Sequence, residues 1–410
     1  METVTRYAEA EYAPGSVGDV FRLIREGVAT SRPALARRTG LAPSTVSLRV
    51  DALTGMGLVV ERGSEDSIGG RRARRLSVSA DSGVVATADV GANHARIALS
   101  DMTGQLLVVE ESPLDTASGP IASVEWLWEH FQTALDSVDK KTGDLRGIAI
   151  GLPAPIEHPS SKVILPSFMP SWHNADLPRL FRSHTELPIL IENDANLVAL
   201  AENAVPDNGR PSHLLAVKLG TRIGCGIISA GRLHRGAAGA AGEISHISVP
   251  GTATLSCSCP EENCLESVAS GGALVARLRN AGYSVAGTAD VVELGRAGDP
   301  AAVEALREAG AHIGSVLSSI VNFFSPHVVV LGGAMSASAP LVAALRAELF
   351  RKCLPLIAND LSVRTSINTA DAGVKGATHL ILEELLAPAR IEHLVRSVES
   401  QGNGPAGAGK

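Results

Sequence analysis

The spacing of hydrophobic residues in the first sixty positions predicts three short helices. Apolar residues recur as on one face of a first helix at Val17, Val20, Phe21, Ile24 and Val28. A second helix is expected over 32–39, with Leu35 and Ala36 facing inward, followed by a tight turn at 40–42. The third helix begins at Pro43, where a missing N–H costs nothing. Its buried face carries Val46, Val50 and Leu53.

A β-hairpin pattern follows the three helices. A short strand is expected over 58–60, then a polar turn over 63–70, then a return strand over 76–78. Three helices and a hairpin, in this order, are typical of a winged helix-turn-helix, whose third helix enters the major groove of DNA.

Beyond residue 80 the pattern changes to buried strands that alternate with helices, which is typical of an α/β fold. Two Gly-bearing hairpins, 84–101 and 214–229, suggest a duplicated unit with a cleft between two lobes. A third Gly turn, Gly332-Gly333, follows the buried strand 328–331. Such turns can place backbone N–H groups against phosphates, although each one alone is more often a plain turn.

A buried strand over 187–191 ends in the polar cluster Glu192-Asn193-Asp194-Ala195-Asn196. Polar groups at the carboxyl end of a strand are where α/β folds place ligands, and Asp194 could act as a general base toward a hydroxyl. The cluster could equally be a turn that caps a helix over 197–203, because Asn and Asp are good N-caps. The two uses are compatible.

The first 80 residues, here called the head, and the rest of the chain, called the body, carry net charges of opposite sign. Residues 1–80 hold twelve Arg and nine acidic residues, a net of +3, whereas the remainder has a net of −10. A basic head on an acidic body indicates nucleic-acid binding; a three-helix interaction module with a solvated Arg cluster is the alternative. The candidate DNA-binding residues are Ser44, Thr45, Ser47, Arg49, Arg71, Arg72 and Arg74.

Composition favours a cytoplasmic protein without a membrane partner. No apolar run reaches membrane-spanning length, and the start Met1-Glu2 lacks the basic and apolar regions of a signal peptide. Five cysteines, mostly in one cluster, suit a reducing compartment better than a disulfide framework.

The densest candidate chemistry is a cysteine cluster. Cys257, Cys259 and Cys264 lie within eight residues, and His246 precedes them by eleven positions. One imidazole and three thiols are a complete set for a closed tetrahedral zinc site, which is favoured here over a disulfide pair or a chance cluster. Such a site would hold the neighbouring carboxylates Glu243 and Glu266 in fixed positions.

Five segments together resemble the ROK family, which comprises repressors, open reading frames and sugar kinases. These segments are Asp89-x-Gly91, Glu192 to Asn196, Gly220-Thr221, Gly242 to His246, and Cys257 to Glu266. The resemblance covers roughly residues 84–390. With its winged head, the whole chain is similar to the ROK transcriptional regulators such as the xylose-responsive repressors.

The resemblance implies an α/β fold: an actin-like, hexokinase-like ROK domain of two lobes, preceded by a winged helix-turn-helix domain that is all-α apart from its wing. It implies a Zn²⁺ ion on His246, Cys257, Cys259 and Cys264, and a sugar in the interlobe cleft. Sugar hydroxyls are then expected to meet Asn193, Asp194, Glu243, His246 and Glu266. In the kinases, the residue that matches Asp194 deprotonates the attacking hydroxyl.

The expected division follows from the same resemblance. The parts are a head over 1–80, a ROK domain over 81–395 with lobes at about 81–205 and 206–370, a last helix at about 373–388 returning to the first lobe, and a disordered tail over 396–410.

The chain departs from the kinase pattern on the side that would face ATP. Active kinases of the family carry Asp-x-Gly-Gly-Thr-Lys in the first hairpin, where this chain has Ala92 and Asn93 in place of the second Gly and the Thr. Arg222 replaces a Gly in the second loop, and Phe168 stands where an Asn would bond a sugar hydroxyl. Asp194 is retained.

These features predict a sugar-responsive transcriptional repressor that is not an enzyme, acting as a homodimer or homotetramer on operator DNA. One alternative is an ATP-dependent sugar kinase with a fused DNA-binding head. Another is regulation by a protein partner rather than a sugar, with the cleft vestigial.

Overall fold

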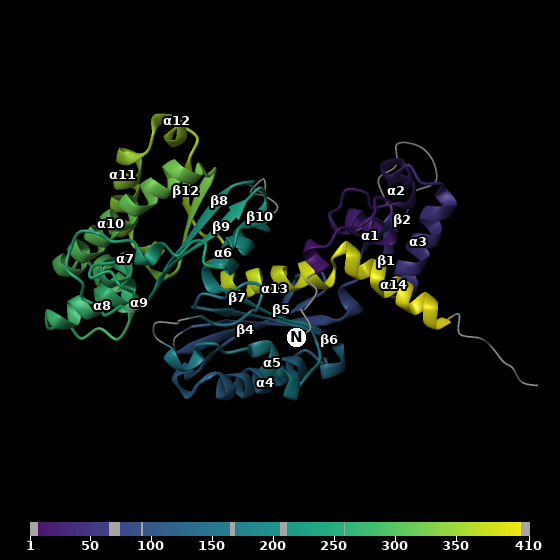
Figure 1. The fold of residues 1–410 in the computed structure, drawn as a ribbon, viewed down its shortest axis with the longest axis horizontal. Coiled ribbons are helices and arrows are strands. Elements are labelled where there is room, and N and C mark those ends of the chain that lie inside the picture. The colour runs from purple at the N-terminus through teal and green to yellow at the C-terminus, as the bar shows by residue number, and fades with distance from the viewer. Residues whose placement is uncertain are drawn as a thin grey trace, which may run out of the picture.

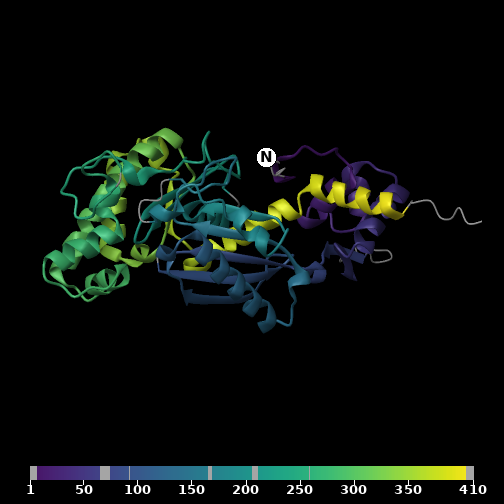
Figure 2. The ribbon, with the colours of Figure 1, turned by 60° about the horizontal axis from the view of Figure 1, so that its bottom comes forward.

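The structure is a computed structural model of the 410-residue chain. It describes residues 7–64, 74–91, 93–164, 169–205, 211–257 and 259–402. An N-terminal head and two lobes follow one another along the chain, and the C-terminal helices return from the lobes to the head (Figures 1 and 2). Within the described part of the chain, no helix is both long and apolar enough to span a bilayer.

The head contains the three helices and the hairpin that the sequence predicts. They are α1 (Val17–Arg25), α2 (Arg32–Thr39), α3 (Pro43–Gly55) and the antiparallel pair β1 (Val59–Ser64) and β2 (Arg74–Val78). Leu35, Val46 and Val50 are fully buried, as expected. The expectation for Val28 is wrong: α1 ends at Arg25, and Val28 is 50% exposed, because the chain turns away after the helix.

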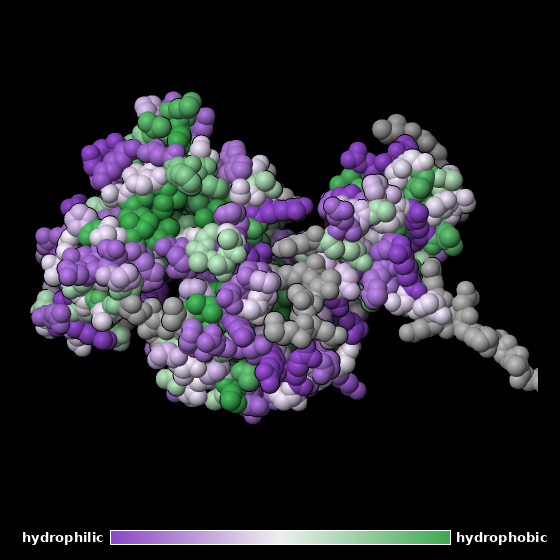
Figure 3. All heavy atoms as spheres, viewed as in Figure 1, coloured by the Kyte–Doolittle hydropathy of each residue, from purple (hydrophilic) through white to green (hydrophobic). Residues whose placement is uncertain are grey.

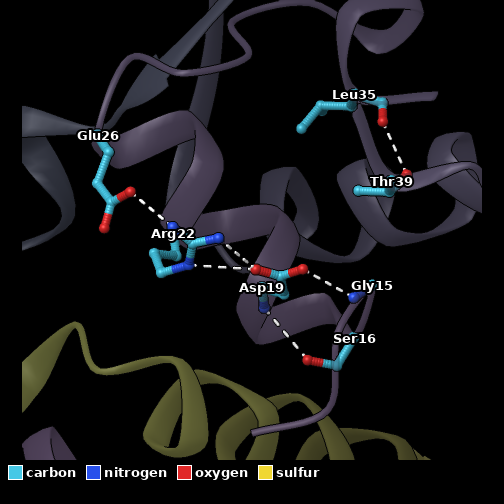
Figure 4. A network of polar contacts seen from close by, with 7 residues as sticks. All are labelled: Gly15, Ser16, Asp19, Arg22, Glu26, Leu35 and Thr39. Carbon is cyan, nitrogen blue, oxygen red and sulfur yellow. Dashed lines mark hydrogen bonds and ion pairs between the residues drawn. The ribbon is translucent and has the colours of Figure 1, made fainter. Parts of the chain in front are cut away.

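Local polar contacts fix where α1 begins (Figure 4). The Ser16 hydroxyl accepts a hydrogen bond from the Asp19 N–H at 3.2 Å, and the Asp19 carboxylate accepts one from the Gly15 N–H at 2.7 Å. Arg22 binds the other oxygen of Asp19 at 2.7 Å and Glu26 at 2.6 Å. Ser16 thereby satisfies an N–H group that a helix leaves unpaired at its first turn, and Asp19 ties the residue before the cap to the helix.

Two five-stranded sheets of the same topology form the lobes, which confirms the predicted duplication. The first sheet has the order β5-β4-β3-β6-β7, and the second has the order β10-β9-β8-β11-β12. In each sheet a hairpin pairs antiparallel and the later strands pair parallel. The strands are β3 (Val84–Val90), β4 (His94–Asp101), β5 (Leu106–Pro113), β6 (Leu145–Leu152), β7 (Ile189–Asn193), β8 (Leu214–Leu219), β9 (Ile223–Ser229), β10 (Arg232–Leu233), β11 (Val328–Gly332) and β12 (Ser362–Thr365).

Helices cover both sheets. The helices that follow the head along the chain are α4 (Pro120–Ser137), α5 (Leu177–Leu180), α6 (Asp194–Asn203), α7 (Leu265–Ala269), α8 (Gly271–Asn280), α9 (Thr288–Arg296), α10 (Pro300–Phe324), α11 (Ala339–Lys352), α12 (Pro355–Ala358), α13 (Ala372–Leu385) and α14 (Pro388–Gly402). α6 packs on β8 and β9 of the second sheet, α13 packs on β3 and β6 of the first, and the two helices cross each other. This crossing joins the lobes.

A glycine makes the crossing possible, and it gives a test of the fold. A Cβ at Gly376 of α13 would lie 1.9 Å from the Leu197 carbonyl oxygen of α6. Gly376→Ala is therefore expected to force the helices apart and to destabilise the protein by about 3 kcal/mol, measured by urea unfolding. Gly143→Ala is the matched control, because its Cβ would meet nothing within 4 Å. Equal stability of the two variants would contradict the close crossing.

The C-terminal helix packs against the head rather than ending in a tail. α14 lies along α1, and its Ile391 and Val395 share one hydrophobic core with Val20. The expected disordered tail is therefore wrong for residues 396–402, which continue the helix, while 403–410 lie outside the described residues. Apolar residues on α14 match the apolar face of α1, so this helix belongs spatially to the head.

Backbone contacts tighten the joint between head and body. The buried Glu384 carboxylate of α13 accepts hydrogen bonds from the N–H groups of Tyr7 and Ala8, at 2.9 and 3.1 Å. The Gly18 N–H donates to Glu392 of α14 at 3.2 Å, and a Cβ at Gly18 would lie 2.0 Å from the Pro388 carbonyl oxygen. The head is thus held directly by the helices that leave the first lobe.

Candidate ligand cleft, metal cluster and DNA-binding head

The predicted metal ligands converge. One donor atom from each of His246, Cys257, Cys259 and Cys264 lies within 4.8 Å of all the others. A bridge between Ser248 and Cys264 ties the His-bearing segment to the start of α7. The donor set therefore fits a metal ion, and it fits a tetrahedral thiophilic one best.

Cys264 is the most firmly placed of the four ligands. It is fully buried and precedes the first turn of α7, where Ser267 lies against its thiol. Burial acts to raise the pKa of Cys264, but hydrogen bonds with Ser267, Cys259 and Cys257 together outweigh it and lower that pKa. A thiol that ionises readily is prepared to bind a cation, because the thiolate is the ligand form.

The cleft lies between the lobes, beside this cluster. Its lining includes the polar or charged side chains of Asn193, Asp194, Asn196, Lys218, Arg222, Glu243, Ser245 and His246. Four of the five predicted sugar-binding residues are thereby brought together, and His246 belongs to both the cleft and the metal cluster.

Asn193 caps α6. Its side-chain oxygen accepts from the N–H groups of Ala195 and Asn196, at 2.9 and 3.3 Å, and its amide donates to the Ala154 carbonyl at 3.2 Å. The predicted capping role is confirmed, although the helix begins at Asp194 rather than at 197. Because the cap holds Asn193 rigid, the neighbouring Asp194 is presented to the cleft in one orientation.

Ion pairs across the lobes were missed by the sequence analysis. Lys218 of β8 places its Nζ 2.6 Å from Asp194 Oδ2, and Arg235 places its Nε 2.7 Å from Glu192 Oε2. Each pair joins a residue from the second lobe to one from the β7–α6 junction. The paired residues are 24 and 43 positions apart in the sequence. Nothing in the hydrophobic pattern marks them as neighbours, so only the folded structure shows these ion pairs.

Glu266 is placed behind the cleft wall. It is 2% exposed; one oxygen accepts from the Ile223 N–H at 3.0 Å and the other binds Arg222 at 3.1 Å. Arg222, which stands where a kinase has glycine, lines the cleft instead. Glu266 therefore positions Arg222 and β9, and any contact of Glu266 with a ligand stays a prediction.

The pKa of Glu243, a carboxylate that lines the cleft, lies well above its ordinary value. Burial, and next the charges of Asp194 and Glu266, raise its pKa from 4.5 to about 7. Because this pKa is higher in the folded than in the unfolded protein, its contribution to stability is complete below pH 4.5 and is lost as the pH rises to about 7.

Glu243→Gln is accordingly expected to be more stable than the unmodified protein at about pH 8 and nearly equal to it at about pH 4. The gain at pH 8 should be about 1 kcal/mol, because Glu243 is exposed and water screens its charge. Urea unfolding at the two pH values measures the difference. Glu110→Gln, at an exposed position of β5, serves as the control. A difference that does not change with pH would show that Glu243 is not the titrating group.

The head presents most of its predicted DNA-binding residues to solvent. Ser44 is exposed, Thr45 and Ser47 are partly exposed, and the Arg74 side chain is 77% exposed. Arg49 differs: its Nη1 is buried and has no hydrogen-bond partner among the described residues. Arg71 and Arg72 lie outside the described residues, as do Ala92 and Phe168.

Leu48 is a feature of α3 that the sequence analysis did not single out. It is 72% exposed on the same helix as Ser44 and Ser47. Arg32 fixes this helix against α2, donating to the Ser47 carbonyl at 3.2 Å and pairing with Asp51 at 2.7 Å. An exposed Leu among short hydroxyls can contact a thymine methyl group in the major groove.

Known protein families and sequences resemble this chain over most of its length. The ROK family model matches residues 85–384. The xylose repressor of Bacillus spizizenii (strain ATCC 23059 / NRRL B-14472 / W23) is 28% identical over 357 residues, covering 87% of this chain and 92% of the relative.

Two crystal structures resemble the fold. A ROK family transcriptional regulator, a homologue of the E. coli MLC protein, has a TM-score of 0.76 at 24% identity and covers 93% of this chain and 98% of its own. A ROK family glucokinase from Streptomyces griseus, in complex with glucose and AMPPNP, has a TM-score of 0.60 at 26% identity and covers 73% and 99%.

Proposed function

This chain belongs to the ROK family, and from that premise we propose that it is a sugar-responsive transcriptional repressor. One observation carries the proposal: the similarity to a xylose repressor and to a ROK regulator extends over about nine-tenths of the chain, whereas the glucokinase accounts for only 73% of it. The regulators therefore match more of this chain than the kinase does, which supports a regulator.

The head supplies the DNA-binding function. Exposed hydroxyls at the N-terminal end of α3 suit phosphates and base edges, and Arg74 at the base of the wing suits the phosphate backbone. Phosphate contacts make such binding fall steeply with salt. We propose operator DNA in the cytoplasm as the partner.

The cleft supplies the effector site. Carboxylates, amides and an imidazole from both lobes line it, and such groups pair with adjacent sugar hydroxyls. We assign Asn193, Asp194, Glu243 and His246 as the residues that meet the sugar, with Glu266 acting through Arg222. Because both lobes contribute, sugar binding favours one lobe arrangement, and a tenfold change in operator affinity needs only about 1.4 kcal/mol of such preference.

We propose Zn²⁺ on His246, Cys257, Cys259 and Cys264. When bound, the ion cross-links the segment that carries Glu243 to the start of α7 and holds the imidazole of His246 in one orientation. Its role is to fix the cleft wall rather than to act on a substrate.

We propose a homodimer, or a tetramer built from dimers, because a symmetric operator needs two recognition helices. Figure 3 shows hydrophobic residues gathered on the second lobe, around α12. Phe323, Leu354 and Leu356 are 92%, 57% and 83% exposed there, and the Leu354 N–H donates to Asn322, beside Phe323. This apolar surface is the candidate subunit interface.

A sugar kinase with a DNA-binding head is the second candidate, because Asp194 is retained in the cleft. A coupled assay of ADP release across hexoses and pentoses separates the two, alongside mobility-shift titration with the DNA upstream of its own gene. The proposed function expects specific DNA binding and no turnover. Turnover that Asp194→Asn abolishes would establish the kinase instead, whether or not the head binds DNA.

A further inference from the structure

A lysine ammonium lies inside the cleft, at the point where the two lobes meet. Lys218 near the end of β8 and Asp194 at the start of α6 line the same cavity, with 2.6 Å between Nζ and Oδ2. Their side chains are 26% and 11% exposed, so the pair is largely shielded from water. Removing one partner of an ion pair with this shielding leaves an uncompensated charge, which costs more than it would on an open surface.

A second carboxylate lies on the same edge of the first sheet as Asp194. Asp89 of β3 pairs in register with Gly151 of β6. Gly151 in turn pairs with Glu192 of β7, two residues before Asp194.

The Oδ1 atom of Asp89 is buried without a hydrogen-bond partner among the described residues. Burial raises the pKa of Asp89, and the charge of Lys218 is the largest influence that lowers it. The surroundings are tight, since a Cβ at Gly373 would lie 2.1 Å from Asp89 Oδ2.

The ammonium stays charged between these groups. Burial acts to lower the pKa of Lys218, but the carboxylates of Asp194 and Asp89 outweigh it and raise that pKa. Two carboxylates held close to each other otherwise attract a divalent cation, for which oxygen atoms are the preferred ligands. Phosphoryl transfer from a nucleotide depends on such a cation to bridge and neutralise the phosphates.

We propose that Lys218 is a built-in cation that takes the place of a divalent metal between Asp194 and Asp89, so that the cleft admits an uncharged sugar and excludes a magnesium–nucleotide complex. The ammonium occupies Oδ2 of Asp194, which leaves Oδ1 to accept a bond from a sugar hydroxyl. A carboxylate that is paired with an ammonium can still accept a hydrogen bond from a ligand. It is a poor general base, because the ion pair disfavours its protonation. The assignment concerns the cleft alone and holds whether or not the head binds DNA.

Thermal unfolding of the zinc-loaded full chain with Mg²⁺ as the probe tests this role. Lys218→Ala and Lys218→Met leave the two carboxylates uncompensated, so both variants are expected to melt below the unmodified protein in metal-free buffer. Addition of about 10 mM Mg²⁺ should then raise their Tm by about 2 °C or more, because a ligand of the folded state stabilises it. The unmodified protein should not respond.

Two further variants make the result specific. Lys218→Ala with Asp194→Asn removes one carboxylate as well, and it should lose the response to Mg²⁺. Lys352→Ala removes a lysine that pairs with Glu348 on the surface of α11, and it should not gain one. Should the Lys218 variants fold only when Mg²⁺ is present, that too supports the proposal.

The proposal is overturned if neither Lys218 variant gains a Mg²⁺ response over the unmodified protein. It is also overturned if calorimetric titration shows that the unmodified protein binds Mg²⁺ and ATP together in the cleft with Lys218 in place.

Discussion

Cys264→Ser is expected to remove the proposed zinc ion from the purified protein and to abolish sugar binding. Cys264 is fully buried at the start of α7 and is one of four donors within 4.8 Å of each other. A closed tetrahedral site that loses a thiolate loses most of its affinity, since apparent binding free energies of structural zinc reach about 10–16 kcal/mol with all ligands present. The zinc content should fall from one ion per chain to less than about a tenth.

The effect should extend to the cleft, because His246 belongs to both the metal cluster and the cleft wall. Metal analysis by mass spectrometry, together with calorimetric titration of sugars, measures the two losses. Cys353→Ser is the matched control: Cys353 is also a buried free cysteine, but it lies outside the cluster. Full zinc occupancy in Cys264→Ser would contradict the ligand assignment.

Ser44→Glu is expected to weaken operator binding at least about 100-fold without unfolding the head, because a like charge placed against a phosphate costs several kcal/mol. Ser44 is exposed in the first turn of α3. At that position a carboxylate favours the helix itself, since negative charge stabilises a helix N-terminus. Loss of binding can therefore be separated from loss of structure.

Fluorescence anisotropy with labelled operator DNA measures this effect, and circular dichroism checks the fold. Gln132→Glu carries the same change in charge at an exposed position of α4 in the first lobe, so it controls for net charge. If the two variants weaken DNA binding equally, α3 does not enter the groove.

Periodicity predicted the fold where one face of an element is buried. The spacing of Val46, Val50 and Leu53 was sufficient to predict α3, and the two Gly-bearing hairpins predicted the duplicated sheets. The cysteine cluster was predictable because its ligands are close in sequence and chemically unambiguous. Val28 shows the limit, since its spacing fits α1 although the helix has already ended.

The contacts that join distant segments were not predictable. Lys218 lies 24 residues from Asp194, and nothing in the strand pattern of β8 marks its side chain as a partner. The attachment of α14 to α1 depends on two amphipathic faces from opposite ends of the chain, each of which could have packed elsewhere. Arg49 has a spacing suited to DNA, but packing beside Gly15 turns one of its nitrogens inward.

These contacts give the proposed response to sugar a physical route. The proposed sugar site lies between the lobes, α13 runs from the first lobe toward the head, and its Glu384 holds the backbone of Tyr7 and Ala8. α14 then packs on α1. A change in lobe arrangement is therefore transmitted to the head through two packed helices rather than through a loose linker.

Titration of the protein–operator complex with a panel of sugars tests the central claim most directly. Fluorescence anisotropy of the full-length, zinc-loaded chain on its operator should show specific binding at physiological salt, and at least one sugar should change the affinity tenfold or more. That change should be lost in Asp194→Ala, which removes a cleft carboxylate and leaves the head untouched. Specific operator binding that no sugar alters, or the same affinity for operator and unrelated DNA, would contradict a sugar-responsive repressor.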